Sequence, residues 1–292
     1  MRLDDSVSAA ISRRWESVRA LIDDAIERYL EGLPEAAVVE AAKYIARGGK
    51  RLRGFLLVSF AEALGASVSD ALDAAVAVEL VHASSLALDD IIDEDLTRRG
   101  SAAAWVRLGL KKTVMVSNIL IPFAQRIVYE RYGAVALERT VRAWLDISRG
   151  EVLDAFIDGE RAGKETYMEM VRLKTGSLFR LSAELGAIAA GRIDLLEEAS
   201  RLGEILGITY QIADDIRDSS DPLKVQREPG LKLFLKWASS LGRAYSTIDF
   251  FLAKAQRIIS SIFKDTQYII YELPRFIINA MLYPRVRSAA TG

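Results

Sequence analysis

A nearly continuous apolar stretch from Ala74 to Leu88 constrains the fold most, because its residues are apolar on almost every side of a helix. A helix of this kind has to be buried among other helices. Apolar residues recur at spacings of three and four along most of the chain, whereas alternating strand-like runs are missing. We therefore expect an all-α fold, a single large helical bundle around a central cavity.

The same periodicity divides the chain into helices separated by glycine-containing breaks. No Gly/Ser-rich or low-complexity linker interrupts it, so residues 1–292 are expected to form one domain. Breaks are expected near Gly32, Gly48-Gly49, Gly65, Gly100, Gly109, Gly159 and Gly191. Helices are expected over residues 6–31, 34–47, 51–64, 69–93, 112–133, 135–157, 165–190 and 195–218.

Composition excludes several classes of function. The formal net charge is -1 with 27% charged residues, so no general basic field would attract nucleic acid. The absence of cysteine excludes disulfides and thiolate chemistry and fits a reducing compartment. The N-terminus is acidic where a secretory signal would be basic, and charges interrupt the apolar stretches, so we expect a cytoplasmic protein without stable membrane insertion.

Two copies of one acidic motif end apolar helices. Asp89-Asp90-Ile91-Ile92-Asp93 follows the apolar stretch, and Asp214-Asp215-Ile216-Arg217-Asp218 follows a second apolar helix. In each motif the first and last carboxylates are four residues apart and so share a helix face, where like charges destabilise a bare helix. Carboxylates at the ends of two core helices can face each other across the interior of a bundle. Hard oxygen ligands of this kind suit Mg²⁺ shared with substrate phosphates.

Three basic clusters accompany the acidic motifs. The first, Gly48-Gly49-Lys50-Arg51-Leu52-Arg53-Gly54, places cations at an expected helix start, where backbone amides also favour an anion. Arg98-Arg99-Gly100 follows the first acidic motif, and guanidinium groups bind phosphate bidentately. Lys174-Thr175-Gly176 lies within an expected helix. By itself each cluster is equally compatible with solvated cations or ordinary charge balance.

Two uncharged polar side chains fall in line with the acidic motifs. His82, the only histidine, is two helical turns before Asp89, and Gln211 is one turn before Asp215. Either could be a core polar residue or a group that faces a ligand. No P-loop, dinucleotide-binding glycine motif or nucleophilic serine elbow is present.

Taken together, these motifs resemble those of the trans-isoprenyl diphosphate synthases. The resemblance is carried by GGKRLRG, HASSLALDDIIDEDLTRRG, KTG and YQIADDIRD, in that order, and spans about residues 34 to 220. It implies the isoprenoid synthase fold, a homodimer and three Mg²⁺ ions per active site. It also implies a prenyltransferase in which an allylic diphosphate ionises to a carbocation, which the double bond of isopentenyl diphosphate attacks before a proton is lost.

The resemblance assigns roles residue by residue. It implies metal ligation by Asp89, Asp93 and Asp214, with Asp90, Asp215 and Asp218 as nearby or water-bridged metal supports. Lys50, Arg53, His82 and Arg99 match positions that bind isopentenyl diphosphate, and Arg98 and Lys174 match positions on the allylic diphosphate. Thr175 and Gln211 match polar groups along the path of the cation.

The segment after Asp218 departs from the family. The usual pair of closing lysines is missing from a shortened stretch, Ser219 to Gly230, where Lys224, Arg227 and Lys232 are the available substitutes. A non-catalytic subunit of a heteromeric synthase would explain this change, although the acidic motifs are intact. A class I terpene cyclase is a further alternative, but Asp218 and Pro222 stand where its second motif would carry Ser and Glu.

Chain length is expected to depend on residues just before the first acidic motif. Ser84 and Ser85 are small where short-chain enzymes often carry aromatic residues, so the resemblance implies a product of C20 or longer, with geranylgeranyl diphosphate as the first candidate. The apolar segment from Leu241 onwards is expected to supply closing helices of the bundle, with membrane-surface contact as the alternative.

Overall fold

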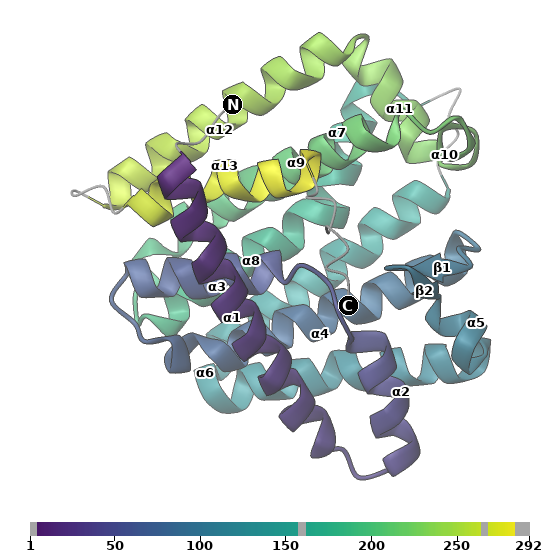
Figure 1. Ribbon diagram of the computed structural model, residues 1–292, viewed down its shortest axis with the longest axis vertical. Helices are drawn as coiled ribbons and strands as arrows, with labels where there is room; N and C mark the ends of the chain where they lie inside the picture. The colour runs from purple at the N-terminus through teal and green to yellow at the C-terminus, as the bar shows by residue number, and fades with distance from the viewer. Residues whose placement is uncertain (1–4, 157–161, 264–267, 284–292) are drawn as a thin grey trace, which may run out of the picture.

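The protein is a bundle of helices with one short hairpin (Figure 1). The computed structural model describes residues 5–156, 162–263 and 268–283. The antiparallel hairpin pairs β1 (Thr97–Arg98) with β2 (Ser101–Ala102). The α-helices are α1 (Asp5–Glu31), α2 (Ala36–Ala46), α3 (Leu52–Ala63), α4 (Val68–Ile92), α5 (Ala104–Leu108), α6 (Leu110–Ala155), α7 (Lys164–Val171), α8 (Ser177–Ala189), α9 (Leu196–Asp218), α10 (Pro222–Arg227), α11 (Pro229–Ala238), α12 (Leu241–Ile262) and α13 (Tyr268–Leu282). The predicted all-α class is confirmed.

Helix α4 is the buried centre of the bundle and packs against α3, α6 and α8. It begins with a capping box, in which Ser67 accepts from the Asp70 amide and Asp70 accepts from the Ser67 amide. By length and composition alone α4 could cross a membrane, but 67% of its most apolar window is buried inside the protein. The apolar stretch is therefore used as a core helix, which carries the first acidic motif at its end.

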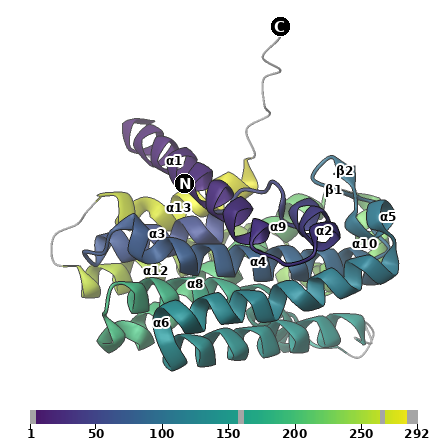
Figure 2. The ribbon, with the colours of Figure 1, turned by 90° about the horizontal axis from the view of Figure 1, so that it is seen from below.

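The two helices expected over 112–133 and 135–157 are the two halves of α6. Gly133 separates them with φ 80° and ψ −167°, a conformation that side chains with a Cβ rarely adopt. Figure 2 shows the halves lying side by side, so the chain reverses at this glycine. The end of the second predicted range, at residue 157, and the break at Gly159 lie outside the described residues.

The single helix expected over 165–190 is wrong in its middle. A π-helical segment, η1 (Arg172–Gly176), separates α7 from α8. Each π turn adds a residue to the helical repeat and so rotates the side chains that follow it. The backbone of η1 lies against Gly150 of α6, where an added Cβ would be 2.5 Å from the backbone nitrogen of Lys174. Glycine at this position therefore allows Lys174 to approach the second half of α6.

A 3-10 turn, η2 (Ile193–Leu195), leads into α9, which ends in the second acidic motif. Helices α12 and α13 pack on α9, as expected for closing helices of the bundle. The segment after Asp218 forms α10 and α11 rather than an open loop. Asp221 caps α10 by accepting from the Leu223 amide at 2.9 Å, and prolines at positions 222 and 229 begin the two helices.

Candidate functional site

The first acidic motif belongs to a larger cluster of carboxylates around one lysine. The Lys174 ammonium, carried by η1, lies 3.1 Å from Asp89, 2.9 Å from Glu151 and 2.9 Å from Asp154. Asp93 is the C-terminal cap of α4, one helical turn after Asp89, and no ion pair joins it to a described residue. Three carboxylates thus share one ammonium ion and a fourth has none, so the cluster carries an excess of negative charge when all are ionised.

The pKa values reflect this excess. Asp93 is exposed as a whole residue, but desolvation of its carboxyl, followed by repulsion from Asp89, raises the pKa of this group to about 6. Burial raises the pKa of Glu151 to about 8 although Lys174 opposes it. A carboxyl whose pKa is raised in this way lacks the positive charge that would stabilise its ionised form. A divalent cation would supply that charge, so the donor set fits the hard oxygen preference of Mg²⁺.

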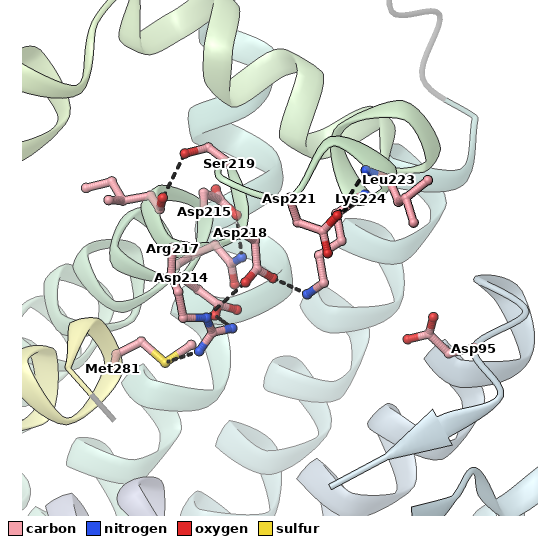
Figure 3. A network of polar contacts seen from close by, with 12 residues as sticks. Asp95, Asp214, Asp215, Arg217, Asp218, Ser219, Asp221, Leu223, Lys224 and Met281 are labelled. Atoms are coloured by element: carbon pink, nitrogen blue, oxygen red, sulfur yellow. Dashed lines mark hydrogen bonds and ion pairs between the residues drawn. The ribbon is translucent and has the colours of Figure 1, made fainter. Parts of the chain in front are cut away.

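The second acidic motif has a different set of partners. The guanidinium of Arg217, from within the motif, contacts both Asp214 and Asp218, and its Nε is 2.9 Å from Asp218 (Figure 3). The Lys224 ammonium, from α10, is 2.5 Å from the other oxygen of Asp218. Burial opposes the lower pKa of Asp218, but hydrogen bonds from Lys224 and Arg217 outweigh it. Burial still raises the pKa of Asp214 to about 6, although Arg217 opposes it. The cations of this motif therefore pair with Asp214 and Asp218 and offset their burial fully only at Asp218.

The middle aspartates of both motifs are engaged on the protein side. Asp90 is buried and accepts from Arg98 at 2.6 Å. Asp215 is also buried and accepts from Tyr167 at 2.5 Å and from Gln211 at 2.9 Å. Burial raises the pKa of Asp215 to about 7. The hydrogen bonds of these two carboxylates hold the helix ends in place. Their supporting role at the metal ions stays a prediction.

Thr175 and Gln211 lie together, as the resemblance implies. Thr175 donates a hydrogen bond to the Gln211 side-chain oxygen at 2.7 Å, and the Gln211 side-chain amide nitrogen donates a hydrogen bond to Asp215. These two hydrogen bonds link η1 to α9 and fix the orientation of both polar groups. Their dipoles are therefore held in place without a solvent rearrangement, which is how a protein stabilises developing charge.

The cations expected to bind isopentenyl diphosphate converge around the start of α3. Arg53 donates to Nε2 of His82 at 3.0 Å, so this histidine is neutral with its proton on Nδ1. Burial, followed by repulsion from Arg53, lowers the pKa of His82 well below its usual value. Lys50 donates to the Ala280 carbonyl of α13 at 2.7 Å, and burial lowers its pKa.

Glycines bring Arg99 into the same region. The Arg99 guanidinium donates to the carbonyls of Arg47 at 2.7 Å and Gly48 at 3.0 Å. A Cβ on Gly49, whose φ is +98°, would be 2.9 Å from this guanidinium. Arg51, in contrast, is buried against Asp23 and Glu79 and serves the core. A pocket of about 230 Å³ opens between α2, α4 and the hairpin, bordered by Gly48, Asp90, Arg98 and Arg99.

The substitute lid residues behave differently from one another. Lys224 reaches Asp218, whereas Lys232 is exposed on α11 and makes no ion pair with a described residue. Glu228, between α10 and α11, has its pKa raised to about 7 by burial, against the effect of Lys224 and with repulsion from Asp218 and Asp93. The adjacent residues Lys174 and Thr175 of η1 contact Asp89 of α4 and Gln211 of α9, which brings the ends of the two helices to one side of the bundle.

Sequence reasoning missed four side chains of this site. Glu151 and Asp154 are spaced i, i+3 near the end of an apolar helix, the same signal that the acidic motifs gave. Tyr167 carried no signal, because its contact with Asp215 joins distant segments. Arg217 was visible inside the second motif but was not singled out. Within the described residues, no three His, Asp or Glu side chains are gathered closely enough to hold a metal ion.

A helical bundle with two acidic helix ends and a set of anion-binding cations beside them is the architecture of an isoprenoid synthase. Residues 35–229 match the polyprenyl synthetase family, and the chain belongs to that family. The predicted fold and the predicted enzyme class, a prenyl-transferring isoprenyl diphosphate synthase, are confirmed.

Individual relatives agree with this assignment. The hexaprenyl pyrophosphate synthase of Saccharolobus solfataricus is 36% identical over 274 residues, which cover 92% of this chain and 95% of that protein. The geranylgeranyl pyrophosphate synthetase of Geoglobus acetivorans superposes with a TM-score of 0.80 at 25% identity, covering 90% of this chain and 99% of that one. A Caulobacter crescentus polyprenyl synthase, complexed with calcium and isoprenyl diphosphate, gives a TM-score of 0.79 at 25% identity, covering 96% and 100%.

Proposed function

We propose that this protein condenses isopentenyl diphosphate with an allylic diphosphate, head to tail, and releases pyrophosphate and a longer allylic diphosphate. The observation that carries the proposal is the carboxylate cluster around Lys174, in which Asp89, Glu151 and Asp154 share one ammonium ion and Asp93 has none. Such a cluster is suited to receive cations together with the diphosphate that they neutralise.

Asp89, Asp93 and Asp214 would hold the Mg²⁺ ions, three of which the resemblance implies. When bound, Mg²⁺ neutralises the charge that develops on a diphosphate leaving group. Lys174 and Arg98 would bind the same diphosphate. Lys50, Arg53 and Arg99 are suited to hold the second diphosphate beside it, with neutral His82 accepting from Arg53. The hydrogen-bonded Thr175 and Gln211 pair would present fixed dipoles to a nearby carbocation.

The direct test is to incubate the purified protein alone with Mg²⁺, isopentenyl diphosphate and each allylic starter, and to measure the chain length of the products. We expect elongation by the protein alone. Cyclised hydrocarbons would instead support a terpene cyclase. No elongation with any starter, together with stimulation of an added active synthase, would support a non-catalytic subunit.

We further propose a product of C20 or longer, with geranylgeranyl diphosphate as the first candidate. Ser84 is fully buried on α4, and its hydroxyl has no hydrogen-bond partner among the described residues. Ser85 only bonds back to the His82 carbonyl at 2.9 Å. Neither side chain is bulky enough to stop a growing chain one turn below Asp89. The relative named hexaprenyl pyrophosphate synthase supports products beyond C20 as well.

The chain-length proposal predicts that Ser84→Phe shortens the main product by at least one five-carbon unit, because an aromatic ring would fill this position. Ser84→Ala removes the hydroxyl without adding volume and should leave the product unchanged. Products are identified by chromatography after dephosphorylation. An unaltered product distribution in folded Ser84→Phe would refute the proposed role of this position.

We also propose a homodimer that uses the outer face of α6. Val141, Leu145 and Val152 are spaced along one face of its second half, and Leu145 is 58% exposed. Met115, on the first half, is 62% exposed. An apolar stripe of this length is unusual on a monomer surface. Leu145→Lys should shift the protein from dimer to monomer in light scattering, whereas the same change at exposed Leu223 of α10 should not.

A further inference from the structure

Arg217 distinguishes the second acidic motif from the first. It is the fourth residue of Asp214-Asp215-Ile216-Arg217-Asp218, where the first motif carries Ile92. Ile92 is 53% exposed and brings no charge to its motif. Arg217 places a permanent cation one residue before Asp218 and three residues after Asp214, within reach of both. The two motifs therefore differ in built-in charge although their carboxylates have the same spacing.

All three nitrogens of the Arg217 guanidinium are engaged. Nη2 contacts Oδ1 of Asp214, Nε donates to Oδ1 of Asp218 at 2.9 Å, and Nη1 lies 3.4 Å from the sulfur of Met281 on α13 (Figure 3). Charge-assisted hydrogen bonds of this kind are about twice as strong as neutral ones. The second oxygen of Asp218 is taken by Lys224. The guanidinium thus bridges the two carboxylates across the space that a shared cation would need.

The same guanidinium is close to a second cation. Lys50 donates to the Ala280 carbonyl, next to Met281, and repulsion from Arg217 contributes to its lowered pKa. Two neighbouring cations repel each other in the ligand-free protein and are both relieved by an anion between them. A guanidinium also binds diphosphate oxygens bidentately. A diphosphate that binds here would therefore attract Arg217 away from the carboxylates of Asp214 and Asp218. These carboxylates would then be free to bind a metal ion.

We propose that Arg217 is a built-in counter-ion that occupies Asp214 and Asp218 in the ligand-free protein and gives them up to a divalent cation only when a diphosphate binds. The inference rests on the proposed function, because it assumes that the second motif receives a metal with the substrate. It makes metal loading ordered: the first motif can bind a cation in the free protein, and the second binds one together with diphosphate. Arg217 would act as a positioning residue that prevents unproductive metal binding.

The test measures Mn²⁺ binding to the full chain by electron paramagnetic resonance, with and without pyrophosphate. In Arg217→Leu the free protein should bind Mn²⁺ at an additional site, or at least tenfold more tightly, and the difference from wild type should shrink with pyrophosphate. Arg201→Leu is the matched control: it removes an exposed arginine from the same helix, which is paired with Glu197 and with no other acidic side chain among the described residues, and it should behave as wild type.

Arg217→Lys provides a second variant in case the leucine variant is unstable, since it keeps the positive charge but lacks the planar fork whose separate nitrogens bond to the two carboxylates. It should show an intermediate affinity. Identical Mn²⁺ isotherms for wild type and both folded Arg217 variants would overturn the inference while leaving the proposed function intact. Wild-type protein that binds no Mn²⁺ even with pyrophosphate would overturn both.

Discussion

The two acidic motifs have the same residue spacing, yet they have different ion-pair partners. At the end of α4, Asp89 competes with two carboxylates of α6 for Lys174, and Asp93 pairs with no described cation. At the end of α9, Arg217 and Lys224 satisfy Asp214 and Asp218 without any ligand. The last carboxylate of the first motif therefore has no paired cation among the described residues, whereas the last carboxylate of the second motif has two.

This difference indicates that a repeated motif does not imply two equivalent sites. Carboxylates that lack counter-charge bind a divalent cation with little competition, whereas carboxylates with a bound guanidinium must first exchange it. The contrast also bears on the departure from the family after Asp218. Lys224, one of the expected substitutes for the missing lid lysines, is paired with Asp218 of the motif itself.

The largest expected effect comes from removing one charge from either motif. Asp93→Asn and Asp214→Asn should each lower kcat by about 10²–10³-fold, the usual cost of losing one preorganised charge interaction in a transition state. Their effects on Mn²⁺ binding to the free protein should differ. Asp93→Asn should abolish it, whereas Asp214→Asn should leave it unchanged because Arg217 already occupies Asp214.

Glu94→Gln is the control for these variants. It removes a carboxylate one residue beyond Asp93, where Glu94 is exposed and lies outside the cluster around Lys174. Its kcat and Mn²⁺ affinity should match those of wild type. An equal loss of Mn²⁺ binding in Asp93→Asn and Asp214→Asn would remove the proposed contrast between the motifs.

A smaller effect should appear in the stability of the metal-free protein. Lys174→Met leaves Asp89, Glu151 and Asp154 without their shared cation and should cost about 3–5 kcal/mol, as for breaking a buried ion pair. Lys224→Met removes a half-exposed ammonium from a motif that keeps Arg217 and should cost about 1 kcal/mol or less.

Urea unfolding with EDTA at pH 8 measures both changes. Added Mn²⁺ should restore part of the loss in Lys174→Met, since the ion replaces the missing positive charge among the carboxylates. Similar destabilisation in the two variants would show that the second motif depends on its lysine as strongly as the first.

Much of this organisation could be predicted from the sequence, because it depends on local patterns. Apolar periodicity located most helices to within a few residues, and the apolar core helix carried its acidic motif to its end as expected. The hairpin at Thr97–Arg98 and Ser101–Ala102 was missed because strands of two residues show no alternation. The π-helical turn at Arg172–Gly176 was missed because the apolar pattern runs through it.

The charge balance of the site could not be predicted, because it depends on contacts between distant segments. Lys174 joins α4, η1 and α6 through partners up to 85 residues away in sequence. Arg217 was present in the motif, but its direction is fixed by Met281 of α13, 64 residues later. Residue types and spacing thus indicated which groups form the site, whereas the fold determined which of them neutralise one another.

The smallest expected effect is a pH dependence that separates Glu151 of the first cluster from Asp218 of the second motif. Glu151, in the first cluster, has its pKa raised by burial to about 8, well above the value of about 4.3 in an unfolded chain. The stability that this group contributes is therefore present below about pH 4 and is lost as the pH rises through 8. Asp218, in the second motif, has a lowered pKa and so contributes in the opposite sense, losing its stabilising effect only in acid.

Between pH 6 and pH 8, the melting temperature of the metal-free protein should therefore fall, and Glu151→Gln should reduce that fall by about 2–4 °C, which corresponds to roughly 1 kcal/mol in a protein of this size. Asp218→Asn should leave the slope over this range unchanged, because Asp218 stays ionised throughout it. Differential scanning fluorimetry in EDTA follows both variants. If the slope instead followed Asp218, the uncompensated charge would belong to the second motif, and the comparison would be reversed.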